Sequence, residues 1–194
     1  MPISPIFLQK TTTTRLFTAR KRSIPAMTES STEIRIAVET DWPRIVEIYN
    51  QAIDDGYCTA DMEHISIDSR RDWFELHTET EYPIHVIISN GEVAGWSSLS
   101  PFRHGRRALA KTIEISYYLD REQRGLGLGK ELMTATINAA RALDHQHLFA
   151  ILLEMNSVSI GLLEKFGFTR WGHMPDVADF GSKRSGLLIY GRKI

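Results

Sequence analysis

One glycine-rich segment constrains this sequence more than any other: Gln123-Arg124-Gly125-Leu126-Gly127-Leu128-Gly129-Lys130. It follows a strand-like run at 112–119 and opens the most regular amphipathic helix pattern of the chain, at 127–143. Glycines let backbone N–H groups approach a ligand without interference from Cβ atoms. The helix N-terminus adds unpaired N–H donors and a partial positive charge. This order of elements predicts an anion site, most naturally for phosphate, although a purely structural glycine turn has the same composition.

Two well-known phosphate loops do not fit the segment. A P-loop requires glycine where Arg124 stands and serine or threonine where Glu131 stands. A dinucleotide fingerprint requires G-x-G-x-x-G after the first strand of a βαβ unit, whereas this loop reads G-x-G-x-G and lies in the middle of the chain. The loop is therefore either structural or belongs to another class of phosphate site.

Hydrophobic periodicity predicts alternating strands and helices around the loop. Thr40 is the expected N-cap of the first helix, and Asn90-Gly91 is the expected turn of a hairpin. Strands mixed with helices predict an α/β or α+β fold with a mixed sheet. The predicted strands are 34–36, 84–89, 93–99, 112–119, 148–153 and 186–192, and the predicted helices are 40–54, 68–78, 127–143 and 156–166.

Charge separates the N-terminal segment from the rest of the chain. Residues 1–26 hold five of the 23 basic residues and no acid, which leaves residues 27–194 with 18 basic and 24 acidic residues and a net charge of −6. So acidic a body is a poor nucleic-acid binder. We expect residues 1–32 to be a basic, hydroxyl-rich tail and 33–194 to be the folded domain. The tail is disordered, an organelle-targeting peptide, or the product of an upstream start codon before Met27.

Composition also limits where and how the chain works. Its single cysteine, Cys58, allows no intrachain disulfide and no cysteine-based zinc site. The seven histidines show no metal-ligand spacing, so we expect no metal. No apolar run approaches the ~20 residues that span a bilayer. These features favour a protein of the cytoplasm without a membrane partner, unless the tail directs it to an organelle.

Two motifs together resemble the GCN5-related N-acetyltransferase superfamily. The first is R-x-x-G-x-G, Arg124 to Gly129, which is similar to the acetyl-coenzyme A pyrophosphate loop of that family. The second, at 156–168, is similar to the N-x-x-[AS]…E-x-x-G-[FY] segment that follows the family's fifth strand. Leu99-Ser100-Pro101-Phe102-Arg103, the run Thr112–Leu119 and Ile48-Tyr49-Asn50 resemble the phosphinothricin and methionine sulfone or sulfoximine acetyltransferases. The resemblance covers residues 33–194.

The resemblance implies a mixed, mostly antiparallel central sheet flanked by helices, a homodimer, and acetyl transfer from acetyl-CoA to the amine of a small amino acid or analogue. Phe102 and Arg103 would bind the acceptor, with the Arg103 guanidinium on its carboxylate or phosphinate. The residues that the resemblance implies for acetyl-CoA are Tyr117, Tyr118, Leu119, Arg124, Gly125, Leu126, Gly127, Leu128, Gly129, Lys130, Asn156, Ser159 and Lys165.

Glu114 is the candidate catalytic residue. It stands between Ile113 and Ile115 and so points to the opposite face of its strand. Partial burial would raise its pKa toward a useful range, although a surface charge on an edge strand would leave the same pattern. With the resemblance, Glu114 is the general base that takes the amine proton, directly or through a water.

The general acid of the family is missing. Many members carry tyrosine, and the phosphinothricin branch often histidine, where this chain has Leu163, which cannot donate a proton to the leaving thiolate. Either the thiolate leaves without help or by water, or another hydroxyl serves, with Tyr118 and Tyr190 as equal candidates.

The acceptor is open as well. The C-terminal part departs from the branch's K-x-G-x-W-x-D pattern near the acceptor, with Ser185-Gly186-Leu187-Leu188 in its place. A protein N-terminus, a polyamine and an aminoglycoside are alternative acceptors. A non-catalytic acyl-CoA-binding module is a further alternative, favoured by Leu163 and opposed by Glu114.

Overall fold

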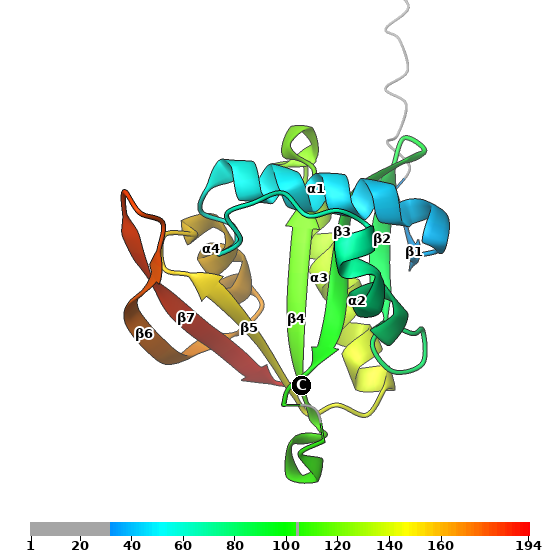
Figure 1. The fold of residues 1–194 in the computed structure, drawn as a ribbon. Coiled ribbons are helices and arrows are strands. Elements are labelled where there is room, and N and C mark those ends of the chain that lie inside the picture. Colours follow the sequence, from blue (N-terminus) through cyan, green and yellow to red (C-terminus); the bar gives the residue numbers. More distant parts are fainter. Residues whose placement is uncertain (1–31, 104) are drawn as a thin grey trace, which may run out of the picture.

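The computed structural model describes residues 32–103 and 105–194, so the expectations for residues 1–31 lie outside the described residues. Seven strands form one mixed sheet in the order β1-β2-β3-β4-β5-β7-β6, in which only the β4–β5 pair is parallel (Figure 1). This is the mixed, mostly antiparallel sheet that the resemblance implies. The elements are β1 (Thr32–Ile36), α1 (Trp42–Asp55), α2 (Arg71–Leu76), β2 (Ile84–Ser89), β3 (Glu92–Pro101), β4 (Thr112–Leu119), α3 (Leu128–Ala142), β5 (His147–Leu153), α4 (Ser157–Lys165), β6 (Thr169–Asp179) and β7 (Arg184–Lys193).

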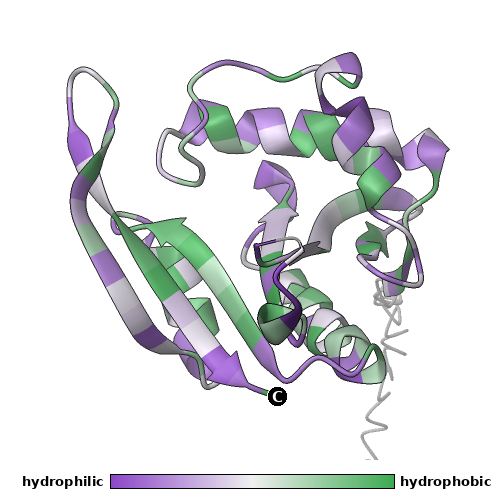
Figure 2. Ribbon diagram, turned by 60° about the horizontal axis from the view of Figure 1, so that its bottom comes forward, coloured by the Kyte–Doolittle hydropathy of each residue, from purple (hydrophilic) through white to green (hydrophobic). Residues whose placement is uncertain are grey.

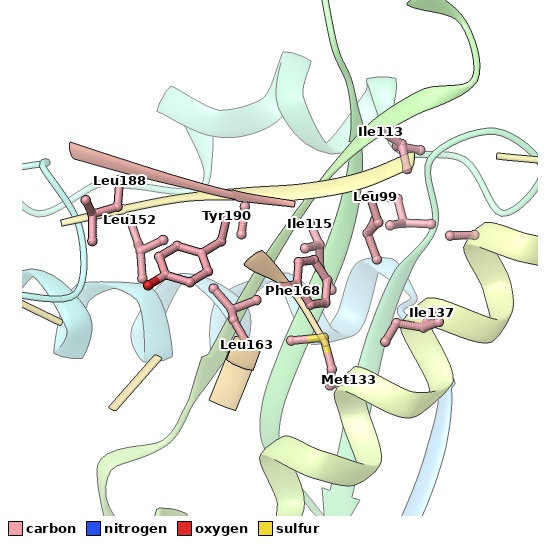
Figure 3. Close-up of a cluster of buried hydrophobic side chains, with 13 residues drawn as sticks. Leu99, Ile113, Ile115, Met133, Ile137, Leu152, Leu163, Phe168, Leu188 and Tyr190 are labelled. Carbon is pink, nitrogen blue, oxygen red and sulfur yellow. The ribbon is translucent and has the colours of Figure 1, made fainter. Parts of the chain in front are cut away.

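Helices cover both faces of the sheet. α1 and α2 lie on one face, where Ile45 and Phe74 pack with Trp96 of β3. α3 and α4 lie on the other, where Met133 and Leu163 join a cluster of buried side chains from β4, β5 and β7 (Figure 3). Alternation along a strand explains the division, since neighbouring residues point to opposite faces.

The sheet opens in its middle. β4 and β5 pair only from Thr112 with His147 to Glu114 with Phe149. Beyond that point β5 stays paired with β7 as far as Leu153, while β4 stays paired with β3. Figure 1 shows the two central strands fanning apart toward α1. The β4 edge from Ile115 to Leu119 therefore has no partner strand in β5.

The outer strand β6 was missed in the sequence. It pairs only with β7, its register shifts between Arg170 and Gly172 and between Met174 and Ala178, and most of its side chains are exposed. Figure 2 shows the contrast between the hydrophobic β5 and the largely hydrophilic β6. Without a buried face a strand has no apolar alternation, and Pro175 further removes the signal, although an edge strand tolerates proline.

Several predicted boundaries differ from the structure, and three of them are instructive. Thr40 is not the N-cap of α1, because the helix begins after Asp41, whose carboxylate accepts hydrogen bonds from the Val38 N–H and the Arg35 guanidinium. The helix expected at 68–78 is a 3₁₀ turn followed by the short α2. β1 begins at Thr32, one residue inside the segment expected to be the tail.

Among the helices that the structure describes, none combines the length and the apolar character needed to cross a membrane.

A substitution at Gly95 tests how closely β3 and β4 approach each other. A Cβ atom at Gly95 would lie 2.4 Å from Leu119 Cδ2 and 2.8 Å from the Tyr118 carbonyl oxygen. Gly95→Ala should therefore lower the free energy of unfolding by about 1–3 kcal/mol. The matched control is Gly161→Ala in α4, where a Cβ would meet no atom within 4 Å and the better helix propensity of alanine should leave stability equal or higher. Urea unfolding of both variants measures the difference; equal stabilities would contradict the packing.

Candidate active site

A cavity of about 280 Å³ occupies the opening between β4 and β5. We call it the strand cleft and define it by 115–119 of β4 and 150–152 of β5, with the start of α4 and the glycine loop at its ends. Its β4 edge carries backbone groups that β5 does not use, because the pairing of the two strands ends at Glu114. Of the residues expected to bind the cofactor, it is lined by Tyr117, Tyr118, Leu119, Arg124, Gly125, Gly129, Asn156 and Ser159.

The glycine loop has the backbone expected of an anion site. Gly125 and Gly127 have φ values of 81° and 90°, a left-handed region that favours glycine. Gly127 is the N-cap of α3, and a Cβ atom there would meet nothing within 4 Å. The start of this 15-residue helix leaves N–H groups without intrahelical partners, next to the open space at Gly127. The loop fits a phosphate group at the mouth of the strand cleft.

Arg124 has a second contact that the sequence did not reveal. Its guanidinium forms an ion pair of 2.6 Å with Asp55, at the end of α1, and donates to the Leu119 carbonyl at 3.3 Å. Arg121 binds the other oxygen of Asp55 at 2.9 Å. Burial raises the pKa of the Asp55 carboxyl, but the two guanidinium groups outweigh burial and hold it below its usual range. Arg124 thus anchors the glycine loop to α1.

The start of α4 closes the other end of the strand cleft. Asn156 is buried, and its side-chain oxygen caps the helix by accepting a hydrogen bond of 3.1 Å from the Ser159 N–H. The Tyr117 hydroxyl donates to the Ser159 carbonyl at 3.4 Å. Burial raises the pKa of Tyr117 to about 12, so this tyrosine is neutral at physiological pH. Both motif residues of α4 therefore shape the wall of the cleft.

Other expected cofactor residues lie outside that wall. The Leu126 side chain is exposed, and Leu128, the first residue of α3, is buried against Ile87, so neither side chain lines the cleft. Lys130 and Lys165 are exposed and do not line the cleft. Their ammonium groups can contribute long-range attraction for an anion.

Glu114 occupies an interior strand, at the base of the opening. Ser100 of β3 and Phe149 of β5 are its directly paired neighbours, so it is not an edge-strand surface charge. Its side chain shares a face with Ser116 and Tyr118, on the side of α1 and α2. Burial raises the pKa of its carboxyl. A half-buried carboxylate with a raised pKa can accept a proton near neutral pH.

A second cavity, of about 170 Å³, lies on the same face of the sheet as Glu114. We call it the aromatic cavity because five rings line it. Ser116 and Tyr118 line both this cavity and the strand cleft, so the two spaces meet across β4. The five rings are those of Tyr49, Trp73, Phe74, Trp96 and Tyr118.

One cation lies among these rings. Arg70 lines the aromatic cavity, with its guanidinium carbon 5.6 Å from the centre of the Tyr49 ring. It donates to Asp61 at 2.8 Å, and the Tyr49 hydroxyl donates to the same carboxylate oxygen at 2.8 Å. A guanidinium has five N–H donors, so this contact leaves donors for an anionic or oxo group in the cavity. No motif in the sequence pointed to Arg70, because α2 and the preceding loop meet α1 only in the fold.

The predicted acceptor residues lie elsewhere. Phe102 packs edge-on against Phe149, with 4.9 Å between ring centres, and Arg103 lies over the Phe102 ring. Arg103 is exposed, and neither residue lines the two cavities. Phe149 is paired with Glu114 between β5 and β4. Phe102 packs on the Phe149 ring, so this ring lies between Phe102 and Glu114 in the chain of contacts.

The two candidate hydroxyl groups are now distinguishable. Leu163, at the position where the resemblance implies a general acid, is fully buried and lines the strand cleft. Tyr190 belongs to the buried cluster of Figure 3, and its hydroxyl donates to Glu164 at 3.1 Å. Tyr118 lines both cavities, and burial raises its pKa well above the usual value. Of the two tyrosines, only Tyr118 lines the strand cleft.

A metal centre has no candidate within 32–103 and 105–194, where no group of three or more histidine, cysteine or acidic side chains lies close enough to hold an ion.

Comparison with known proteins gives a consistent picture. The family model of the acetyltransferase (GNAT) family matches residues 42–168. YwnH of Bacillus subtilis is 38% identical over 162 residues, which cover 83% of this chain and 98% of that protein. The L-methionine sulfoximine/L-methionine sulfone acetyltransferase of Pseudomonas aeruginosa is 36% identical over 150 residues, 76% of this chain and 86% of the relative.

A solved structure shares the architecture. The phosphinothricin acetyltransferase of Sinorhizobium meliloti, whose structure is a complex with acetyl-CoA, superposes with a TM-score of 0.79 at 28% identity, over 84% of this chain and 88% of that one.

The glycine loop gives the first test of this site. Gly127→Val places a branched side chain in the open space before α3 and should weaken acetyl-CoA binding at least tenfold by isothermal titration calorimetry. Any side chain at a φ of 90° also strains the backbone. Gly181→Val is the matched control, since Gly181 has a φ of 78°, has no atom within 4 Å of a Cβ and lies in the β6–β7 turn. Equal acetyl-CoA affinities in the two folded variants would remove the loop from the site.

Proposed function

Because the chain belongs to the acetyltransferase (GNAT) family and is an acetyl-CoA-dependent N-acetyltransferase, we propose that its acceptor is the amine of a small amino acid or a close analogue. One observation carries the proposal: the strand cleft and the aromatic cavity meet at Ser116 and Tyr118, on the strand that carries Glu114. A cavity of about 170 Å³ has room for one side chain and not for a folded protein surface. The names of the relatives, which refer to methionine sulfoximine and phosphinothricin, support the same class.

The residues present fit acetyl-CoA. The open loop at Gly125–Gly127 suits the pyrophosphate, and the unpaired edge of β4 suits the amide-bearing arm. When bound, acetyl-CoA supplies an acetyl group activated as a thioester. We assign the stabilisation of negative charge on the carbonyl oxygen to a backbone N–H within Tyr117–Leu119, a contribution of ~3 kcal/mol in comparable sites. The acceptor amine then approaches from the aromatic cavity.

Glu114 prepares the amine in this mechanism. An ammonium group has no lone pair, so it must lose a proton before it can attack. Burial raises the pKa of the Glu114 carboxyl. The difference in pKa between this carboxyl and the ammonium group of the acceptor is therefore smaller, and proton transfer is easier. The carboxylate takes the proton directly or through a water at the base of the opening.

The leaving thiolate has weak assistance here. Leu163 offers no proton, and the Tyr190 hydroxyl is bound to Glu164. We assign any donation to Tyr118 or to a water in the strand cleft, because Tyr118 alone of the candidate hydroxyls lines that space. A free thiol has a pKa of ~8.5, so a thiolate can also leave unprotonated.

The charge of the aromatic cavity favours one acceptor class over the alternatives. Its only charged lining residue is Arg70, and Asp61 nearby is already bound to that guanidinium. A polyamine or an aminoglycoside would bring several cations toward this arginine. An amino acid brings an anionic carboxylate, or a polar oxo group in its side chain, that Arg70 can bind. The non-catalytic alternative leaves the buried Glu114 without a use.

Two further expectations remain proposals. A homodimer is supported by exposed apolar side chains on β6, including Trp171, Met174 and Val177. A monomeric mass by sedimentation would exclude it. A location in the cytoplasm is proposed from composition and is checked by cell fractionation.

Glu114→Gln tests the base. The variant keeps the shape and removes the proton acceptor, so kcat/KM should fall by about 10²–10⁴. Since the carboxylate is the active form, the wild-type rate should rise with pH through the Glu114 pKa, above the usual carboxyl range, and the variant should lack this ascending limb. Full activity with an unchanged profile would exclude Glu114 from the mechanism.

Arginine variants test the acceptor. Methionine sulfone, methionine sulfoximine, phosphinothricin and spermidine are assayed by thiol release. Arg70→Gln should raise the KM of the amino-acid acceptors about 10- to 100-fold, because it removes charge-assisted hydrogen bonds, and leave acetyl-CoA affinity unchanged. Arg71→Gln is the matched control, because this neighbouring arginine is exposed and pairs with Asp68. An increase confined to Arg103→Ala would instead support the acceptor site expected from the sequence. Turnover of spermidine alone would contradict the acceptor class.

A further inference from the structure

The hydrogen bonds of His77 fix its protonation. His77 follows α2, and its Nδ1 lies 2.6 Å from the Trp73 carbonyl oxygen. A carbonyl oxygen only accepts, so Nδ1 must carry the hydrogen. Burial lowers the pKa of His77, which keeps the ring neutral at physiological pH. In a neutral ring with a hydrogen on Nδ1, the other nitrogen, Nε2, is an acceptor.

The acceptor nitrogen of His77 fixes the direction of a hydroxyl. Nε2 lies 3.1 Å from Ser100 Oγ, so the Ser100 hydroxyl donates to His77. A serine hydroxyl has one hydrogen, and this contact uses it. Ser100 can therefore only accept hydrogen bonds from any other group. The ring of His77 lies 4.1 Å, between centres, from the ring of Trp73, which lines the aromatic cavity.

Ser100 lies directly opposite Glu114. The two residues are paired in the β3–β4 register and share a face, which puts their Cβ atoms about 4.5–5.5 Å apart. Within 32–103 and 105–194, no hydrogen bond joins the two side chains. A group with hydrogens to donate would find an acceptor on each side, the Glu114 carboxylate and the Ser100 oxygen.

We propose that His77 is a positioning residue that keeps the Ser100 hydroxyl turned away from Glu114, so that Ser100 accepts a hydrogen bond from the substrate amine and does not donate one to the carboxylate. The inference rests on the proposed function, because it assigns the base to Glu114. A donated hydrogen bond would stabilise the carboxylate and make it a weaker base. His77 thus preserves the basicity that the reaction needs.

Few neighbouring groups can change the basicity of the Glu114 carboxylate. Ser100 faces it from β3, and Phe149 faces it from β5 and brings no charge. The raised pKa of Glu114 has burial as its cause, with no contribution from a described charged group. His77 has as its contacts the Trp73 carbonyl and ring and the Ser100 hydroxyl. A single hydroxyl hydrogen therefore decides whether a donor points at the carboxylate.

His77→Phe is the test. Phenylalanine keeps a ring against Trp73 and removes the nitrogen that holds the Ser100 hydrogen, which becomes free to donate to Glu114. The ascending limb of the kcat/KM profile should move to lower pH by about 0.4–1 pH unit, the shift that corresponds to one ordinary hydrogen bond. Unchanged acetyl-CoA affinity shows that the variant is folded.

Ser100→Ala supplies the matched background. In this background, His77→Phe should not move the limb further, because no hydroxyl is left to turn. A merely structural His77 would lower the rate at every pH and leave the limb in place, in either background, and that result overturns the inference. An equal shift with and without Ser100 also overturns it.

Glu114→Gln separates this inference from the proposed function. If Glu114→Gln abolishes the limb while His77→Phe fails to move it, the base is Glu114 and His77 has no positioning role. If the limb survives in Glu114→Gln, the proposed base is wrong, and the inference about His77 falls with it.

Discussion

The end of pairing between β4 and β5 is the constraint on which the rest of this structure depends. Two strands that separate after Glu114 leave one edge of β4 without the backbone hydrogen bonds that β5 would supply. Unpaired backbone groups inside a protein are costly unless a ligand or water satisfies them. The opening is held from both sides, because β5 remains paired with β7 and β4 with β3. It therefore persists as a cavity that a chain-like ligand with amide groups can fill.

Alternation along β4 then divides the work of the site between two faces. Tyr117 contacts the start of α4, while Glu114, Ser116 and Tyr118 face α1 and α2. The strand cleft and the aromatic cavity share Ser116 and Tyr118, so the two substrates of a transfer reaction can meet without sharing a pocket. α1 couples the two spaces, because Tyr49 lines the aromatic cavity and Asp55 anchors the glycine loop through Arg124.

Elements with a buried face were predictable from the sequence. β4 agrees in both bounds with the predicted strand, and α3 and β5 agree to within one residue, because each buries a regular apolar set. β6 was missed, because it lies at the edge and buries little. The start of α1 was predicted one residue too early. Asp41 forms an ion pair with Arg35 of β1, and the rules for helix caps consider only residues within the first turn of the helix.

The sequence by itself determined the glycine loop before α3 and the carboxylate of Glu114 on the face opposite two isoleucines, since each depends on local spacing along one element. The tertiary structure decided which residues line the aromatic cavity and which residue lies opposite Glu114. Arg70 and Trp73 line the same cavity as Tyr118 only because α2 and the turn before it pack across the sheet, and Ser100 lies opposite Glu114 only through the pairing of two strands. Such contacts join residues far apart in the chain, and local periodicity carries no information about them.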